Sequence, residues 1–274
     1  MRVALLQMNG GIDPAANART IVEAVAEAKA GGAAMLFTPE MSNLIDRDRE
    51  RAAASIVAEA DDPVLVLVRT AARAEGLWVH LGSLAVRRAD GRFANRSFVI
   101  DAGGEVRARY DKLHLFDVDV GGGDRWRESA VYAPGEGAVV VGTPVGPLGP
   151  TICYDLRFAE LYHALAVAGA HVLAVPAAFT RPTGAAHWHL LLRARAAETG
   201  CFVIAAAQTG EHEDGRATYG HSLVVDPWGE VLLDMGEAPG LGFAEIEAER
   251  VAEVRARIPV LDHARAIPPV EVAQ

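Results

Sequence analysis

Long apolar stretches and export signals are missing from this sequence. The longest apolar runs, such as residues 202–207, are far short of the ~20 residues that cross a bilayer. Residues 1–9 (MRVALLQMN) lack the apolar core and the cleavage site of a signal peptide. We therefore expect a cytoplasmic protein that does not bind membranes.

Cysteine and positive charge are also scarce. Two cysteines, Cys153 and Cys201, are too few for a disulfide scaffold and suit a reducing compartment. Acidic residues number 36 against 26 Lys and Arg, so the formal net charge is −10 at pH 7, and no Lys/Arg cluster offsets it. This balance argues against nucleic acid and anionic membrane as partners.

Apolar residues, in contrast, are abundant. They make up 51% of the 274 residues, and charged residues make up 23%, which is typical of a soluble globular protein. A chain of this length buries enough surface to need no disulfide staple. By length alone it could form one large α/β domain or two smaller ones.

The first half of the chain predicts alternating strands and helices. Strands are expected at 2–8 and 34–38, and the helix between them begins after Asp13 and ends before Gly31. This order implies parallel pairing of the two strands. Further along, helices are expected at 49–60 and 64–75, and strands at 78–86, 97–101 and 105–110.

The second half repeats this order, with strands expected at 149–153, 171–175, 201–207, 222–226 and 230–233, and helices at 158–167 and 185–198. Identities accompany the repeat: Ser97, Val99, Asp101, Gly104, Glu105 and Val106 recur 125 positions later as Ser222, Val224, Asp226, Gly229, Glu230 and Val231. Common hairpin chemistry is an alternative explanation for such short matches. Together with the shared order, they predict two like sheets packed face to face in one α/β domain over residues 1–274.

Several common catalytic and metal-binding motifs are absent from the sequence. It contains no G-x-S-x-G elbow, no Walker A motif and no G-x-G-x-x-G. His187 and His189 lie two residues apart on an expected helix, so their side chains point about 200° apart and cannot share a metal ion. No metal site is therefore expected.

Cys153 is the candidate nucleophile. A lone cysteine in an apolar run is commonly a small core residue, and Cys201, which opens an expected strand, keeps that interpretation. Cys153 instead ends the expected strand at 149–153 and precedes the expected helix, with Asp155 placed to cap it. Catalytic groups of α/β sheets lie at such strand ends, and the helix dipole would favour the thiolate.

A carboxylate and an ammonium group complete a candidate catalytic set. Glu40 follows the expected strand at 34–38, and Lys112 follows the one at 105–110. Each alone could be a solvated surface charge, and one of the nine histidines could serve as the base instead. At strand ends together with Cys153, however, they match a nucleophile, its base and an electrophilic stabiliser.

Three segments resemble the Glu, Lys and Cys motifs of the nitrilase superfamily, the carbon–nitrogen hydrolases: residues 37–40 (FTPE), 110–117 (YDKLHLFD) and 152–158 (ICYDLRF). The separations of 72 and 41 residues between the three motif residues also suit this family. The resemblance implies a four-layer αββα sandwich. It also implies that no metal or organic cofactor is needed, and that the chain forms a homodimer or a larger homo-oligomer through helices beside the active site.

The resemblance also implies roles for individual residues. Glu40 would act as the base, Cys153 would form a thioester, and Lys112 with the backbone N–H of Tyr154 would hold the oxyanion. Glu128, in residues 126–135 (WRESAVYAPG), resembles a second glutamate that keeps the lysine charged. The alternative for Glu128 is a solvated loop charge.

Downstream segments resemble the Nit subgroup, which includes deaminated glutathione amidases and ω-amidases: residues 178–180 (AFT), 183–188 (TGAAHW), 192–196 (LRARA), 205–210 (AAAQTG) and 219–229 (YGHSLVVDPWG). This implies hydrolysis of the terminal amide of a small, anionic 2-oxo acid amide such as 2-oxoglutaramate. Arg157 is the candidate cation for the anionic end of the substrate, and a salt bridge with Asp155 or Glu160 is its alternative role. Phe179 and Thr180 are candidate pocket residues.

Two other functions are compatible with this sequence. The same Glu, Lys and Cys residues could serve an N-carbamoyl amino acid amidohydrolase or a nitrilase. A catalytically silent regulatory or binding protein is the alternative from another class, although the complete catalytic set argues against it.

Overall fold

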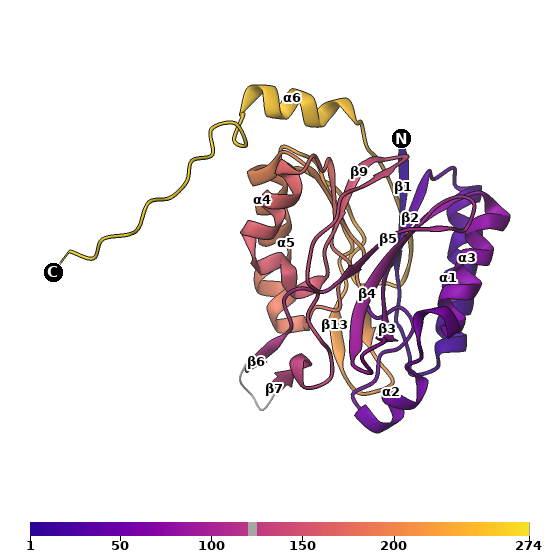
Figure 1. The fold of residues 1–274 in the computed structure, drawn as a ribbon. Helices are drawn as coiled ribbons and strands as arrows, with labels where there is room; N and C mark the ends of the chain where they lie inside the picture. The colour runs from indigo at the N-terminus through magenta and orange to yellow at the C-terminus, as the bar shows by residue number, and fades with distance from the viewer. Residues whose placement is uncertain (120–124, 274) are drawn as a thin grey trace.

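The apolar segments form two six-stranded mixed sheets in the computed structural model, which describes residues 1–119 and 125–273 (Figure 1). The first sheet has the order β16-β1-β2-β3-β4-β5, with β1 (Arg2–Gln7), β2 (Met35–Phe37), β3 (Trp78–Arg87), β4 (Phe93–Ile100), β5 (Val106–Asp111) and β16 (Gly240–Glu245). The second has the order β15-β14-β11-β10-β9-β8, with β8 (Val141–Thr143), β9 (Gly146–Pro150), β10 (Val172–Ala174), β11 (Phe202–Ala205), β14 (Leu223–Val225) and β15 (Val231–Asp234). Two small ribbons pair β6 (Asp117–Asp119) with β7 (Arg125–Arg127) and β12 (Thr209–Glu211) with β13 (Ala217–Tyr219).

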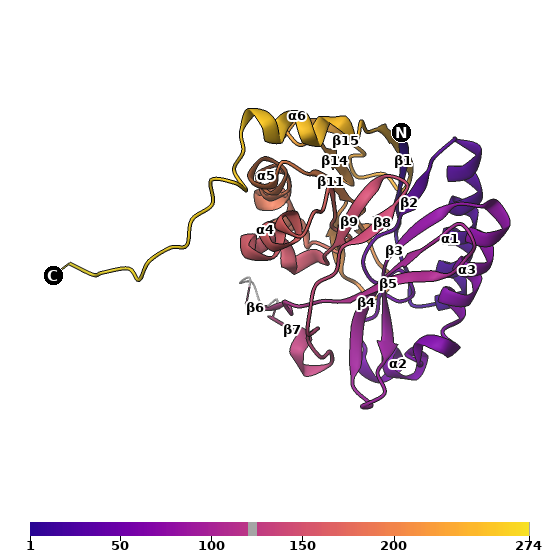
Figure 2. The same ribbon diagram turned by 45° about the horizontal axis from the view of Figure 1, so that its top comes forward.

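Helices cover the outer face of each sheet. The α-helices are α1 (Pro14–Ala30), α2 (Arg49–Ser55), α3 (Pro63–Glu75), α4 (Ala159–Val167), α5 (Arg181–Thr199) and α6 (Glu249–Arg257), and the 3-10 turns are η1 (Glu59–Asp61), η2 (Glu128–Ala130) and η3 (Cys153–Arg157). Helices α1 and α3 lie against the first sheet, and α4 and α5 lie on the far side of the second (Figures 1 and 2). The expected cap is present, because the Asp13 side chain accepts a hydrogen bond from Ala15 N at the start of α1.

The two sheets share one topology, which confirms the predicted repeat of elements. Strands β1, β2 and β3 pair in parallel, as do β9, β10 and β11, and two antiparallel strands continue each sheet. An antiparallel edge strand, β16 or β8, completes each sheet on the other side. The identities 125 positions apart fall on equivalent strands, because Val99 lies on β4 and Val224 lies on β14.

Three apolar clusters define the layers. One lies between the first sheet and its helices, and another lies between the second sheet and its helices. The third contains residues of both sheets, including Leu5, Phe37, Val172 and Ile204, and therefore lies between them. The predicted α/β fold, a four-layer αββα sandwich, is confirmed. None of the helices in the described residues has the length and apolar character needed to cross a membrane.

The structure corrects two predicted elements. Strand β9 ends at Pro150 rather than at Cys153, because residues 153–157 form the 3-10 turn η3 before α4 begins. The helix expected at 49–60 ends at Ser55 and is followed by a separate turn. Beyond α6, residues 264–273 are exposed and lack regular structure, and they extend away from the sandwich (Figure 1).

Candidate active site

The ends of three strands bring the predicted catalytic residues together. Glu40 follows β2, Lys112 directly follows β5, and Cys153 follows β9. With Glu128 on η2, they line one cavity of about 400 Å³, a volume that accommodates a small molecule. All four predicted catalytic side chains therefore face a common space.

Lys112 lies between two carboxylates. Its Nζ is 2.9 Å from Glu40 Oε1, and it is 3.1 and 2.9 Å from the two carboxylate oxygens of Glu128. Only 2% of Lys112 and 4% of Glu40 is exposed, so these charges are compensated by one another rather than by water. The backbone N–H of Phe116 also donates to Glu128 Oε2 at 2.7 Å and fixes its orientation.

These contacts keep the buried pair ionised. Burial alone would raise the pKa of Glu40, but the charge of Lys112 and hydrogen bonds from Lys112, the Cys153 thiol and Asn95 outweigh it and lower that pKa. Burial would lower the pKa of Lys112, but the charges of Glu128 and Glu40 outweigh it and hold that pKa well above its ordinary value. The site therefore contains a carboxylate and an ammonium group at neutral pH.

Cys153 occupies a sharp turn with backbone φ of +49°, a region that residues other than glycine rarely adopt. Its N–H donates to Pro176 O, just after β10, at 2.9 Å. Buried Asp155 secures the turn by accepting hydrogen bonds from Ile152 N at 2.9 Å and from the Tyr110 hydroxyl at 2.7 Å. Asp155 thus stabilises the turn at Cys153, and it does not cap α4 as expected.

The prediction that a helix dipole favours the Cys153 thiolate is wrong. Burial and then the neighbouring charge of Glu40 raise the pKa of this thiol well above its ordinary value, and Lys112 opposes them only in part. Cys153 and Glu40 line the same cavity, and their charges act on one another. Cys153 therefore rests as a thiol beside a carboxylate that can accept its proton, which is the arrangement of a nucleophile with its base.

Comparison with known proteins decides the family. The carbon-nitrogen hydrolase family matches residues 2–256, and deaminated glutathione amidase from Yersinia enterocolitica is 41% identical over 270 residues, 96% of this chain and 92% of that protein. The chain belongs to the carbon–nitrogen hydrolase family. It is therefore an enzyme that hydrolyses carbon–nitrogen bonds.

Solved structures of carbon–nitrogen hydrolases and their relatives share this fold. The Caenorhabditis elegans NitFhit protein superposes with a TM-score of 0.89 at 38% identity, over 96% of this chain and 65% of that one. A variant of the amidase from Nesterenkonia sp. AN1 superposes with a TM-score of 0.80 at 30% identity, over 94% of this chain and 98% of that one. In that structure acrylamide has added to the active-site cysteine.

In this carbon–nitrogen hydrolase, three of the four predicted substrate-binding residues line the cavity. They are Tyr154, Phe179 and Thr180. Arg157 does not line it: its guanidinium lies 3.4 and 3.5 Å from His187 Nδ1 and 5.7 Å from the centre of the Phe179 ring. The salt bridge considered for Arg157 does not form in the described residues either. Sequence proximity to the nucleophile was a poor guide, because the side chain leaves η3 toward α5.

Four arginines that the sequence did not indicate also line the described part of the cavity. They are Arg47, Arg49, Arg127 and Arg216. Each belongs to a polar segment far along the chain from Cys153, so nothing in the local pattern distinguished it from a surface charge.

Two amides that support Glu40 were also missed. Asn95 on β4 donates from Nδ2 to Glu40 Oε1 at 2.9 Å and to Glu128 Oε1 at 3.2 Å. Gln208 donates from Nε2 to the Glu40 backbone carbonyl at 3.0 Å, and Ala178 N donates to Glu40 Oε2 at 2.9 Å. The resemblance included Ala178 and Gln208 in its segments without a role, whereas Asn95 gave no signal of its own.

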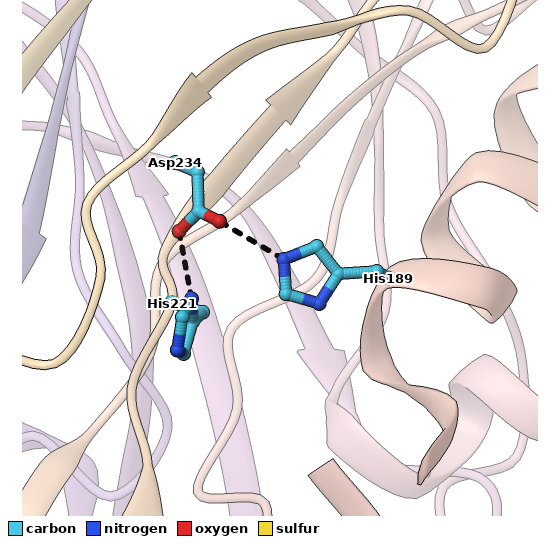
Figure 3. Close-up of side chains that lie close together, drawn as sticks. All are labelled: His189, His221 and Asp234. Carbon is cyan, nitrogen blue, oxygen red and sulfur yellow. Dashed lines mark hydrogen bonds and ion pairs between the residues drawn. The ribbon is translucent and has the colours of Figure 1, made fainter. Parts of the chain in front are cut away.

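A second cluster, His189, His221 and Asp234, has the ligand types that divalent transition metals accept (Figure 3). His189 Nε2 is 3.0 Å from Asp234 Oδ2, and His221 Nδ1 is 2.9 Å from Asp234 Oδ1. The carboxylate thus lies within hydrogen-bond distance of both imidazoles, and the cluster connects α5 to β15. His189 and His187 do diverge, as predicted, but the sequence did not indicate that His189 meets two distant residues.

Proposed function

We propose that this enzyme is a cysteine-dependent amidase that hydrolyses the terminal amide of a small 2-oxo acid amide, either deaminated glutathione or 2-oxoglutaramate. The observation that carries the proposal is the convergence of Glu40, Lys112 and Cys153 on one cavity, with Lys112 bound to Glu40 at 2.9 Å. The 41% identity to deaminated glutathione amidase supports the substrate class. The products are a carboxylate and an amine or ammonia.

In the first step Glu40 takes the proton of Cys153, and the sulfur attacks the amide carbonyl carbon. A carbon–sulfur bond forms and the carbonyl oxygen becomes an oxyanion. The Lys112 ammonium and the backbone N–H of Tyr154 stabilise it, since the first N–H groups of a helical turn lack intrahelical acceptors. Oxyanion donors contribute roughly 3–4 kcal/mol each in other hydrolases.

In the second step the tetrahedral intermediate collapses. Glu40 returns its proton to the leaving nitrogen, the carbon–nitrogen bond breaks, and the acyl group remains on Cys153 as a thioester. Glu40 then removes a proton from water, which attacks the thioester carbon. The carbon–sulfur bond breaks as Glu40 returns this proton to the sulfur, which regenerates the thiol and the Glu40 carboxylate and releases the carboxylic acid product. Glu128 keeps Lys112 protonated throughout.

The thioester is tested with the Glu40→Gln variant and a p-nitrophenyl ester of the same acyl group, whose leaving group needs no proton. Without its base the variant cannot activate water, so we expect a burst of about one equivalent of nitrophenol and an acyl adduct on Cys153 by intact-mass spectrometry. Cys153→Ala serves as the control and should show neither. Adduct on any other residue, or turnover by Cys153→Ala, would contradict the mechanism.

A substrate panel tests the substrate class. Wild-type enzyme should release amine or ammonia from deaminated glutathione or 2-oxoglutaramate with a higher kcat/KM than from N-carbamoyl amino acids or nitriles. Preference for a carbamoyl compound or a nitrile would assign the same catalytic residues to that other chemistry. No turnover of any compound would favour a binding role.

We further propose that the chain forms one domain over residues 1–274, works in a reducing cytoplasm, and assembles as a homodimer or a larger homo-oligomer. Both cysteines are free, and the outer faces of α4 and α5 expose Val167 and Leu190. These exposed apolar side chains are compatible with the pairing through helices that the family resemblance implies. Sedimentation velocity should show a dimer or larger species that Leu190→Glu weakens, and a wild-type monomer at micromolar concentration would refute the assembly.

A further inference from the structure

The catalytic cavity carries a local excess of positive charge. Among the residues that the structure describes, five basic side chains and three carboxylates line it, although the whole chain has a formal net charge of −10. The Lys112 charge is matched by Glu40 and Glu128. The excess therefore belongs to the arginines, and two of them, Arg47 and Arg216, contact the same aromatic side chain.

That aromatic residue is Trp126. The guanidinium carbon of Arg47 lies 4.9 Å from the centre of its ring, and that of Arg216 lies 5.3 Å from it. Cation–π contacts of this kind stabilise each arginine only modestly and do not neutralise its charge. Trp126 also has a buried indole N–H, Nε1, without a hydrogen-bond acceptor in the described residues. A buried donor left unsatisfied in a cavity wall is costly and is expected to meet an acceptor when a ligand binds.

Arg216 is held rigidly for such a role. Its Nε lies 2.8 Å from Asp214 Oδ2, and only 1% of the Asp214 side chain is exposed. The Arg216 backbone N–H donates to the other oxygen of the same carboxylate at 3.0 Å. Asp214 engages Nε, and within the described part of the chain neither terminal nitrogen of the guanidinium forms a hydrogen bond, so both can meet a planar, bidentate partner.

Arg47 has no carboxylate partner within the described part of the chain. Its acidic neighbours are engaged elsewhere: Asp46 forms a bidentate contact with Arg51, at 2.6 and 2.8 Å, and Asp48 caps α2. Arg51, which binds Asp46, is the main group that lowers the pKa of Asp46. The charge of Arg216 lowers this pKa further, so Arg216 also lies near Asp46. Among the described residues, Arg47 is therefore a cation at the cavity without a carboxylate partner of its own.

The cations are connected to the reacting atoms through aromatic contacts. The Trp126 ring lies 6.1 Å from that of Phe116, and Phe116 lies 5.1 Å from the ring of Tyr154, the residue after the nucleophile. All three line the same cavity. A ligand that reaches Cys153 can thus extend along this wall toward the arginines.

We propose that Arg47, Trp126 and Arg216 form a carboxylate-binding subsite, which fixes a substrate carboxylate that lies away from the scissile amide. This inference rests on the proposed amidase function. It replaces Arg157, which lies outside the cavity lining, as the source of the cation that an anionic substrate needs. The carboxylate can come from the 2-oxo acid part, present in both proposed substrates, or from the leaving peptide of deaminated glutathione.

The test measures KM and kcat of Arg47→Gln with deaminated glutathione, with 2-oxoglutaramate, and with deaminated glutathione whose terminal carboxylate is blocked as an amide. Loss of one charge-assisted contact should raise KM by roughly 10- to 100-fold while kcat changes by less than about 2-fold. A rise of KM with both proposed substrates assigns the subsite to the 2-oxo acid carboxylate. A rise with deaminated glutathione alone, absent for its blocked form, assigns it to the leaving peptide.

Two further variants keep the result interpretable. Arg92→Gln makes the same change in net charge at an exposed residue outside the cavity lining, and it should leave KM unchanged. Arg216→Lys keeps a cation beside Asp214 but loses the planar fork, so it should raise KM without loss of folding. If both cavity variants match Arg92→Gln with every substrate, the subsite is refuted. If wild-type enzyme hydrolyses none of the substrates, the proposed function itself has failed.

Discussion

A buried thiol beside a buried carboxylate shares a proton with it, and the charge of Lys112 decides where that proton rests. Lys112 lowers the pKa of Glu40, and Glu40 in turn raises the pKa of Cys153. Neutralising Glu40 should therefore have opposite effects on two proton transfers. It should make the Cys153 thiol easier to ionise, and it should abolish the proposed proton transfer from Glu40 to the leaving nitrogen.

We expect Glu40→Gln to lower kcat for amide hydrolysis by roughly 10²- to 10⁴-fold, since general acid–base catalysis is lost. In the same variant Cys153 should react with iodoacetamide at pH 7 at least as fast as in wild type, because the charge that raised its pKa is gone. Peptide mass spectrometry measures the labelling, with fully buried Cys201 as the unlabelled internal control. Slower labelling of Cys153 in a folded variant would contradict this account.

Asn95 offers a test of the same electrostatics by pH. Its side-chain amide donates to both Glu40 and Glu128, so Asn95→Asp would place a third carboxylate against them. A nearby negative charge favours the protonated form of Glu40 and raises its pKa. The acid limb of the kcat/KM profile should therefore move to higher pH, with a larger loss at pH 6 than at pH 8. Asn95→Ala, which adds no charge, should shift the limb less, and an unmoved limb in both would refute the link.

At this scale the sequence predicted the residues with a chemical signature and missed those placed by the fold. Glu40, Lys112 and Cys153 each lie at or just after an expected strand, and this position in the sequence distinguishes them from ordinary surface residues. Asn95 reaches Glu40 only because β4 pairs with β3 and β5 in one register, which local sequence does not encode. Arg157 shows the converse error, since a residue near the nucleophile in sequence can still point elsewhere.

The segments that follow β2 and β10 approach β3 closely at Gly82. A Cβ there would lie against Thr38 O and 2.6 Å from both Pro39 O and Pro176 Cβ. Residues 38 and 39 lead into Glu40, and Pro176 O binds the Cys153 N–H, so one glycine lets both catalytic segments approach. The irregular pairing of β3 with β4 between Leu81 and Leu84 lies at the same place.

Gly82→Ala should therefore both destabilise the protein and lower kcat. Overpacking of this kind costs about 1–3 kcal/mol or more, and the forced shift displaces Glu40 and Cys153, the proposed base and nucleophile, together. Thermal unfolding and steady-state kinetics measure the two effects. Gly137→Ala is the matched control, since no atom lies within 4 Å of its Cβ position, and it should be near neutral. Normal kcat in Gly82→Ala would show that the close approach is not needed.

Helices and strands were predicted correctly where a long apolar pattern marks them. They were missed where an element is defined only by its pairing with another strand. The helix after Asp13 and the strands β1, β3 and β11 follow from apolar runs of clear period. The edge strands β8, with one glycine among three residues, and β16, with two among six, are recognised only through their partners. The turn at Cys153 reads as a strand because its residues are apolar, although buried Asp155 holds it in another conformation.

Across the whole molecule, the two halves depend on each other. The repeat of elements predicted two like sheets, yet it could not predict which residues meet between them. Glu40 from the first half accepts from Ala178 N and its carbonyl accepts from Gln208, both of the second half. The cluster between the sheets draws side chains from both, so neither half has a complete core alone.

We therefore expect one cooperative unfolding transition, in which activity and both halves are lost together. Ile204 is fully buried between the sheets, and Ile204→Ala should lower the free energy of unfolding by about 2–5 kcal/mol without splitting the transition. Calorimetry tests this, because the calorimetric and van't Hoff enthalpies should agree for the whole unit. Val66→Ala, on the exposed side of α3, should change stability by no more than about 0.5 kcal/mol. Two separated transitions, with Ile204→Ala moving only one, would show that the second sheet and its helices form an independent unit.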